Sequence, residues 1–365
     1  MHKLSISVEQ ILVLLDGMLD KESGIEFKRF RSAEIRKESV IIWLDLYLVN
    51  ALQKVRVSPE TLLSELVSVG GLKYARKGNK NVLIHVGLQN AINQQGLNRL
   101  VFSEVLPETQ DSYALINATN DAFETLCSDI LSQNGYVVDY SQVRKSEAWS
   151  KLLVATHQLS ALKPPFLVGE NVKAFLINLY NLMVLHAKCV LGHPETVAQR
   201  STFFKATAFM IAGSIVSCGE LEHGVLRGRI STKFKPLSLD PRIHFVLNCG
   251  AKSCPPIVPL KQETLDTQLN ECMSNFLSES TRFDRTSKVM KVSRLLKWYQ
   301  RDFSYETDAD LHEWISEHVN DGKRKEISDV KRIKFSRYDW AENGNINTRP
   351  DNRYMMVYDM SFKRI

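Results

Sequence analysis

The segment from Ala174 to Val190 constrains the fold most, because its side chains are apolar nearly all the way round a helix. A surface helix carries one apolar stripe, whereas a helix that is apolar on every side needs a protein interior around it. The run is shorter than the ~20 apolar residues of a membrane span, and Asn178 and Asn181 interrupt it. We therefore predict a buried central helix within a domain that has a sizeable core.

Length and composition allow more than one folding unit. The chain has 365 residues, of which 44% are apolar and 24% charged, as is typical of a globular protein. At roughly 150 residues per domain, two units are expected. We predict a small module at residues 1–95, a linker at 96–120, a larger domain at 121–345 and a C-terminal tail at 346–365.

The N-terminal module is expected to have three helices followed by a hairpin. Helices are predicted at about 8–19, 40–52 and 60–69, the last with Ser58 as its cap. Two strand-like runs, 72–75 and 81–84, flank a turn at 77–80. This order is typical of a winged-helix module, and with the Trp43-Leu44 pair it resembles DEP signalling domains.

The larger domain is predicted to mix helices with short strands, which makes the fold class α+β. Apolar residues at helical spacing, together with caps and breakers, predict four helices. These helices are expected at 121–131, 146–162, 174–190 and 264–278.

The most informative segment runs from Asp240 to Pro256. Its first half is predicted to be a strand, in which Arg242, His244 and Asn248 share one face and Cys249 lies on the other, apolar face. Cys249 is then a small core residue. Cys254 follows the strand in a turn that two prolines hold rigid, and it is the better candidate for a reactive thiol.

A thiol needs a base or a positive field before it becomes nucleophilic near neutral pH. We assign Cys254 as the nucleophile, His244 or His223 as the base and Asn248 as the residue that orients the base. Arg227 and Arg242 are candidate contacts to the substrate or to an oxyanion, and the helix amides Asn178 and Asn181 are candidate substrate contacts. Two alternatives stay open: the amides can satisfy loop backbone groups, and His244 can be a hydrogen-bonded core histidine.

This set of residues is that of a cysteine hydrolase, so papain-like and transglutaminase-like architectures are candidates for the larger domain. His223, His244, Cys249 and Cys254 could also be metal ligands, but the spacing of the cysteines exceeds that of structural zinc sites and the strand turns Cys249 away from His244. We expect no metal. Glycine patterns that cradle phosphates are absent, so no cofactor is expected either.

Charge and cysteine usage limit the partners. The chain has 47 Lys and Arg against 41 Asp and Glu, and its basic residues are interleaved with acidic ones, so we expect no nucleic-acid partner. The six cysteines are too sparse for a disulfide scaffold. Because the N-terminus also lacks a signal-peptide pattern and no transmembrane segment is evident, we predict a cytoplasmic protein with reduced thiols.

Six motifs in order carry a family resemblance. They resemble the signatures of the uncharacterised domain-of-unknown-function family 547 over about residues 136–343, and the resemblance implies no particular activity. The motifs lie at Val138–Ser141, Ala174–Asn181, Glu222–Gly228, Asp240–Pro256, Lys297–Phe303 and Tyr338–Asn343. Within them, Asp302 and Asp339 are candidates to pair with Arg227 or Arg242 and so to position the loop.

Two functions from different classes follow. The first is a thiol-dependent hydrolase or acyltransferase that acts on peptide or amide bonds through Cys254. The alternative is a non-catalytic signalling or scaffold protein whose DEP-like module binds a membrane surface or a partner protein. A structural role for every motif is the third possibility.

Overall fold

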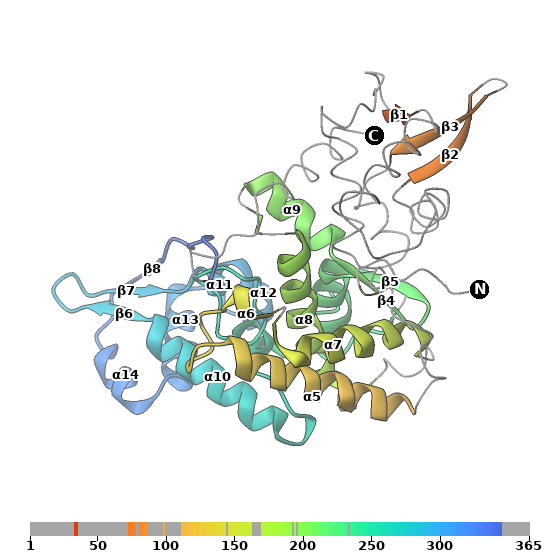
Figure 1. Ribbon diagram of the computed structural model, residues 1–365. Coiled ribbons are helices and arrows are strands. Elements are labelled where there is room, and N and C mark those ends of the chain that lie inside the picture. The colour runs from red at the N-terminus through yellow and green to blue at the C-terminus, as the bar shows by residue number, and fades with distance from the viewer. Residues whose placement is uncertain are drawn as a thin grey trace.

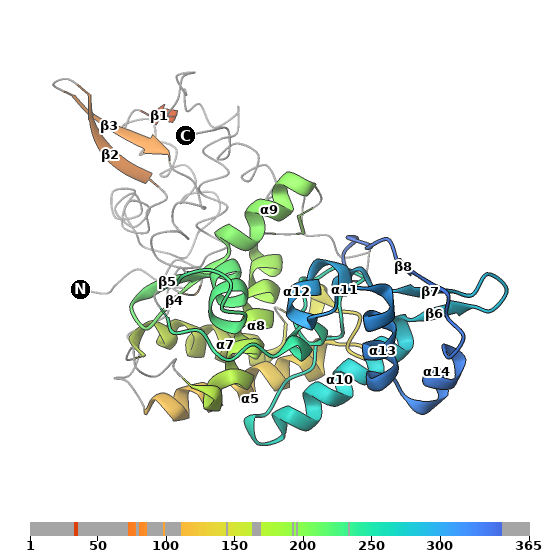
Figure 2. The same cartoon turned by 180° about the vertical axis from the view of Figure 1, so that it is seen from behind.

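Helices make up most of the described chain, and three small sheets accompany them in this computed structural model (Figures 1 and 2). The structure describes residues 33–35, 72–77, 80–85, 98 and 111–344, except 144, 163–168, 192, 195 and 233. The predicted mixture of helices and sheets is thereby confirmed.

The helix predicted to be buried is α8, which spans Lys173–Leu191. Its side chains are buried without interruption from Ala174 to Cys189, which confirms the prediction. Helices α5 and α7 pack against each other, and α5 also packs on α8. Side chains of Asp111 and Ser146 cap the first turns of α5 and α7. The bounds are α5 Ser112–Ile130 and α7 Glu147–Gln158.

The C-terminal part of the domain builds a second core around a three-stranded sheet. Strand β7 pairs with β6 in antiparallel fashion and with β8 in parallel fashion, and α10 and α13 pack together beside it (Figure 1). The bounds are α10 Leu265–Ser280, β6 Arg282–Asp284, β7 Val289–Val292, α11 Arg294–Trp298, α12 Gln300–Phe303, α13 Asp308–His318, α14 Asp321–Glu326 and β8 Arg332–Phe335.

Shorter elements connect these two cores. Strands β4 and β5 form an antiparallel hairpin that packs beside the helix layer. A π-helical turn, η6, follows the hairpin and contacts α8. The bounds are α6 Tyr140–Val143, α9 Val197–Ala206, β4 Ala208–Ile211, β5 Ser214–Ser217 and η6 Glu220–Leu226, with 3-10 turns η3 Leu159–Ala161, η5 Glu170–Val172 and η8 Gln262–Thr264.

Three strands are described in the N-terminal region. β2 (Leu72–Lys77) and β3 (Lys80–His85) form the predicted hairpin, and β1 (Ala33–Ile35), which was not predicted, pairs with β3. The predicted helices of this region and the tail at 346–365 lie outside the described residues. Helix α5 begins at Ser112, inside the stretch predicted as a linker.

The strand predicted over the first half of the Asp240–Pro256 segment is wrong. Residues Pro241–Phe245 form a 3-10 helix, η7, because the side chain of Asp240 caps it through the Arg242 N–H and Pro241 fixes the first backbone angle. The alternation of two faces that a strand would show is absent, since the consecutive residues Ile243, His244 and Phe245 are all buried. No helix in the described ranges is long and apolar enough to cross a bilayer.

Candidate functional site

The Asp240–Pro256 segment runs along the junction of the two cores. Ile243 and Val246 belong to the core around α8, whereas Phe245 and Cys254 belong to the core around the three-stranded sheet. Side chains from both hydrophobic cores therefore meet along this segment.

Asparagine amides hold the segment in place. Asn181 of α8 donates to the Val246 carbonyl (2.9 Å) and accepts from the Asn248 N–H (2.8 Å). Asn248 in turn donates to the Pro255 carbonyl (2.6 Å) and accepts from the Gly250 N–H (2.7 Å), which closes the loop that carries both cysteines. Asn181 therefore satisfies backbone groups of the loop, which was the alternative to a contact with substrate.

The two cysteines of the loop lie together with a tyrosine, and we call Cys249, Cys254 and Tyr338 the thiol site. The Sγ atoms of the cysteines are 2.9 Å apart, and the Tyr338 hydroxyl is 3.1 Å from Cys254 Sγ and 3.4 Å from Cys249 Sγ. The Cys249 N–H also donates to Cys254 Sγ (3.2 Å). Cys254 Sγ thus lies within hydrogen-bond distance of three groups, of which the Cys249 N–H can only donate.

These contacts separate the acidities of the two thiols. Burial opposes ionisation of Cys254, but hydrogen bonds from Cys249, Tyr338 and two backbone N–H groups outweigh it and lower its pKa to about 7. The pKa of Cys249 is raised, because Cys249 donates to Cys254 and is shielded from water. Burial and the two nearby thiols likewise raise the pKa of Tyr338, which therefore stays a hydrogen-bond donor.

A buried lysine supports the same loop from α8. Lys188 Nζ donates to the Gly250 carbonyl (2.6 Å) and lies 3.3 Å from the Glu342 carboxylate. Burial lowers the pKa of Lys188, and Glu342 opposes that effect. Gly250 has φ +79°, and a Cβ there would lie 2.5 Å from Lys188 Nζ. Only a residue without a side chain leaves room for this contact.

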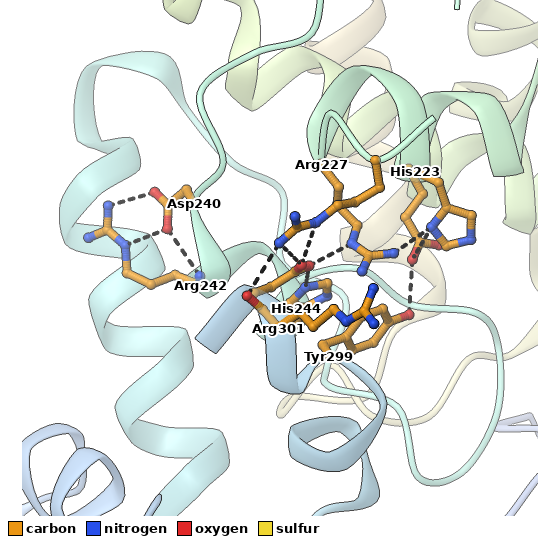
Figure 3. Close-up of polar contacts among 10 residues, drawn as sticks. His223, Arg227, Asp240, Arg242, His244, Tyr299 and Arg301 are labelled. Carbon is orange, nitrogen blue, oxygen red and sulfur yellow. Dashed lines mark hydrogen bonds and ion pairs between the residues drawn. The ribbon is translucent and has the colours of Figure 1, made fainter. Parts of the chain in front are cut away.

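The second cluster surrounds a buried carboxylate, and we call His223, Arg227, Arg229, His244, Tyr299 and Asp302 the histidine network (Figure 3). Asp302, whose side chain is fully buried, accepts from His244 Nε2 (2.8 Å), Arg227 Nε (2.6 Å) and Arg229 (2.7 Å). Burial alone would raise the pKa of Asp302, but these three donors hold it well below its usual range. The predicted pairing of Asp302 with Arg227 is confirmed.

His244 is a buried, partnered histidine in this network. Its ring stacks on Tyr299 with centroids 3.6 Å apart, and the Tyr299 hydroxyl donates to Glu222 (2.9 Å). Burial lowers the pKa of His244, against the pull of Asp302. His223 is more exposed and lies 2.7 Å from Arg227 through Nδ1. Both predicted bases are therefore in one network.

The structure divides the predicted site residues into separate groups. Among the described residues, no hydrogen bond joins His223 or His244 to Cys254. Arg242 pairs with Asp240 and Asp266 and, in the part of the chain that the structure describes, has no hydrogen bond or ion pair with a residue of either cluster. Figure 3 shows its pair with Asp240 beside the histidine network. Asn178 clamps Leu260 through both backbone groups and lines a pocket of about 510 Å³ on that side of α8. Within the described chain, no group of three or more His, Cys, Asp or Glu side chains fits a metal ion.

Sequence reasoning missed three residues that complete the thiol site and its loop. Tyr338 lies within one of the recognised motifs, and its hydroxyl was the available signal. Cys249 was turned away from the site by the predicted strand. The role of Lys188 could not be recognised from the sequence, because a lysine near the end of an apolar helix is usually a surface residue.

Comparison with known proteins supports the family resemblance over part of the domain. No curated protein and no solved structure matches this chain. Three of the six motifs lie within the part of the chain that does match a family. Two of the other three contact these through Asp302, Tyr338 and Asn343, and the remaining one bonds to Asn343 through the Val138 N–H. Residues 166–277 match the family described as "Protein of unknown function, DUF547".

Proposed function

We propose that the larger domain is a thiol-dependent hydrolase or acyltransferase acting on peptide or amide bonds, with Cys254 as its nucleophile. The observation that carries the proposal is the set of hydrogen bonds that Cys254 receives from Tyr338, Cys249 and the backbone. Such donors favour the thiolate, which is the nucleophilic form. Cys254, which is 3% exposed, and Tyr338 are among the residues that line a pocket of about 280 Å³, and we propose this pocket as the substrate site.

The reaction follows from this arrangement. The Cys254 thiolate attacks the carbonyl carbon, and the C–S bond forms as the carbonyl electron pair moves onto oxygen. Collapse of the tetrahedral intermediate breaks the C–N bond, and the leaving nitrogen takes up from water one proton, equivalent to the proton that Cys254 released on ionising. Water, or a second nucleophile, then attacks the thioester carbon, the C–S bond breaks with its electron pair on sulfur, and the attacking group releases a proton that can return to Cys254.

In this proposal the nucleophile Cys254 is activated by hydrogen bonds rather than by a histidine base. Tyr338 and Cys249 are the groups in contact with Cys254, whereas His244 is bound to Asp302. A histidine oriented by a polar partner is also a component of cysteine hydrolase sites, and we keep papain- or transglutaminase-like character as part of the proposal for the fold. Because the chemistry requires a reduced thiol, we place the protein in the cytoplasm.

The test is the pH dependence of iodoacetamide alkylation at each cysteine of the native chain, read by mass spectrometry. Cys254 should react with a midpoint clearly below the ~8.5 of a free thiol. Cys272 is the internal control, because burial and Glu271 raise its pKa to about 11. Equal behaviour of the two thiols would reject an activated Cys254.

Activity is then measured on a panel of peptides and simple amides. Cys254→Ser should abolish turnover, whereas Cys272→Ser should leave it unchanged, because Cys272 does not line the pocket. Turnover that survives in Cys254→Ser would show that another residue is the nucleophile.

A second candidate function rests on the N-terminal sheet. In this sheet β1 and β2 both pair with β3 in antiparallel fashion, and β2 and β3 form the hairpin predicted for the module. In the sequence Arg76, Lys77 and Lys80 flank the turn of the hairpin, a group of basic residues suited to an acidic surface. We propose this module as a binding site for a membrane surface or a partner protein.

Sedimentation with phosphatidylcholine vesicles, with and without phosphatidylserine, tests the membrane form of this candidate. The full chain should bind only the anionic vesicles, and replacement of Arg76, Lys77 and Lys80 by Glu should remove the binding. Absence of binding to either vesicle would leave a protein partner, to be sought by pull-down with the same two chains.

A further inference from the structure

The pocket beside Cys254 has a strongly positive wall. Its lining includes Lys252, Arg282, Arg294 and Arg337 but only one carboxylate, that of Glu279. Glu279 already accepts a hydrogen bond from the Tyr136 hydroxyl (2.9 Å). The basic side chains therefore outnumber the acidic ones four to one around a pocket that Cys254 also lines.

These basic groups differ from the arginines of the neighbouring clusters in having no carboxylate partner. Arg294 donates to the Ser336 carbonyl (2.9 Å), and Arg282 donates to backbone carbonyls. Lys252 and Arg337 are exposed, and neither has a hydrogen bond or an ion pair through its side chain within the described chain. By contrast, Arg227, Arg229 and Arg242 are each bound to an aspartate.

Hydroxyl groups add neutral donors to the same wall. Ser253, Ser280, Ser293 and Ser336 all line the pocket. Ser280 Oγ is buried without a hydrogen-bond partner among the described residues. Ser253 Oγ accepts from the Asp339 N–H (2.8 Å), which leaves its own proton to donate. A buried polar group without a partner marks a position where a ligand atom can complete the hydrogen bonding.

Guanidinium, ammonium and hydroxyl donors around one opening are the groups that bind oxyanions. We propose that this pocket binds an oxyanion, so that the substrate of Cys254 carries a carboxylate or phosphate group beside the carbonyl that the thiol attacks. The inference rests on the proposed function, because it names the substrate class of the same site. The shared chemistry is a negatively charged oxygen group, which acidic peptides and phosphorylated acyl compounds can both supply.

The first test compares an anionic with a neutral alkylating agent. Iodoacetate and iodoacetamide react with thiols by the same displacement, so the ratio of their rates reports the charge around each sulfur. The ratio at Cys254 should exceed that at Cys272, and Arg294→Gln or Arg337→Gln should lower it by about threefold each, as expected for one charge removed at short range in a wet site. Arg285→Gln, which removes an exposed charge outside the pocket, should leave the ratio unchanged.

The two proposals fail in different ways in this experiment. An unactivated Cys254, seen with iodoacetamide alone, rejects the proposed function. A Cys254 that is activated but shows the iodoacetate preference of Cys272 rejects the oxyanion pocket and leaves the proposed function standing.

A protection assay distinguishes the two sources of the anion. Succinate and inorganic phosphate are added at matched ionic strength, with chloride as the control, and the iodoacetamide rate at Cys254 is measured. Protection by succinate favours a carboxylate-bearing substrate, and protection by phosphate favours a phosphorylated one. Protection by neither anion overturns the inference, and Arg337→Gln should weaken whichever protection is seen.

Discussion

The thiol site and the histidine network both include residues of the Asp240–Pro256 segment, yet they satisfy their polar groups in opposite ways. In the histidine network one buried carboxylate holds Arg227, Arg229 and His244, each within 2.9 Å. In the thiol site two cysteines and a tyrosine are joined by contacts of 2.9 to 3.4 Å without a charged partner, and the pocket beside them has an excess of positive charge.

This difference separates a structural role from a chemical one. A fully paired buried charge cluster is rigid and costly to disturb, because removal of one partner leaves the others charged and without water. A thiol that is stabilised by a few hydrogen bonds can change state at low cost. We therefore expect variants of the histidine network to change stability first and variants of the thiol site to change reactivity first.

Oxidation of the two cysteines should give the largest change in the reactivity of the thiol site. The Sγ atoms of Cys249 and Cys254 lie 2.9 Å apart, and a disulfide needs about 2.05 Å. Diamide, which takes up the two electrons and two protons, should therefore form this disulfide and abolish iodoacetamide labelling of Cys254. Mass spectrometry should show the linked peptides, and reduction should restore labelling.

Cys249→Ser is the control for the disulfide. It leaves Cys254 without the neighbouring thiol, so diamide should no longer protect Cys254 from labelling. Protection that persists in Cys249→Ser would show that Cys254 pairs with another thiol.

In the histidine network, Asp302→Ala should lower the free energy of unfolding by about 3 to 5 kcal/mol, because it leaves the largely buried Arg227 guanidinium and the buried His244 ring without their acceptor. Asp339→Ala is the matched control, since within the described chain the exposed Asp339 carboxylate accepts only the Ala341 N–H (2.9 Å). That variant should cost about 1 kcal/mol or less. Urea unfolding of both variants measures the difference, and equal losses would contradict the assignment of Asp302 as the centre of the network.

The loop between the two clusters gives a smaller effect. Gly250→Ala should cost about 2 to 4 kcal/mol, because its positive φ is strained for a side chain and the new Cβ meets Lys188. Gly213→Ala has a similar φ of +71° but open space around it, so about 1 to 2 kcal/mol is expected. The gap between the two, measured by urea unfolding, isolates the contact with Lys188. No gap would mean that the lysine moves aside freely.

The sequence predicted the helices better than the segment that holds the site. The buried α8 and the capped α7 follow from local patterns, and so does the N-terminal hairpin. The strand over residues 242–249 was wrong because an Asp-Pro pair starts a 3-10 helix in spite of apolar alternation. One misassigned element then turned Cys249 away from Cys254.

The choice of partners could not be deduced from local patterns. Asp302 and Arg227 are 75 residues apart in the chain, and their pairing was proposed only because both lie in recognised motifs. Cys254 and Tyr338 are 84 residues apart, and nothing in the spacing of either residue indicates the other. Contacts of this kind depend on how the two cores dock, which is a property of the whole fold.

The smallest effect decides which cluster activates the thiol. Tyr338→Phe removes the hydroxyl that donates to Cys254, so the pKa of Cys254 should rise and the alkylation midpoint should move up by about one pH unit, as expected for loss of one hydrogen bond to a charged group. His244→Gln, which keeps a donor toward Asp302, should leave that midpoint unchanged, because His244 does not contact Cys254. Both variants are measured with the wild type over about pH 6 to 9, where a free thiol titrates. The opposite pattern, a shift in His244→Gln and none in Tyr338→Phe, would return the role of base to His244 and would require the two clusters to approach each other during the reaction.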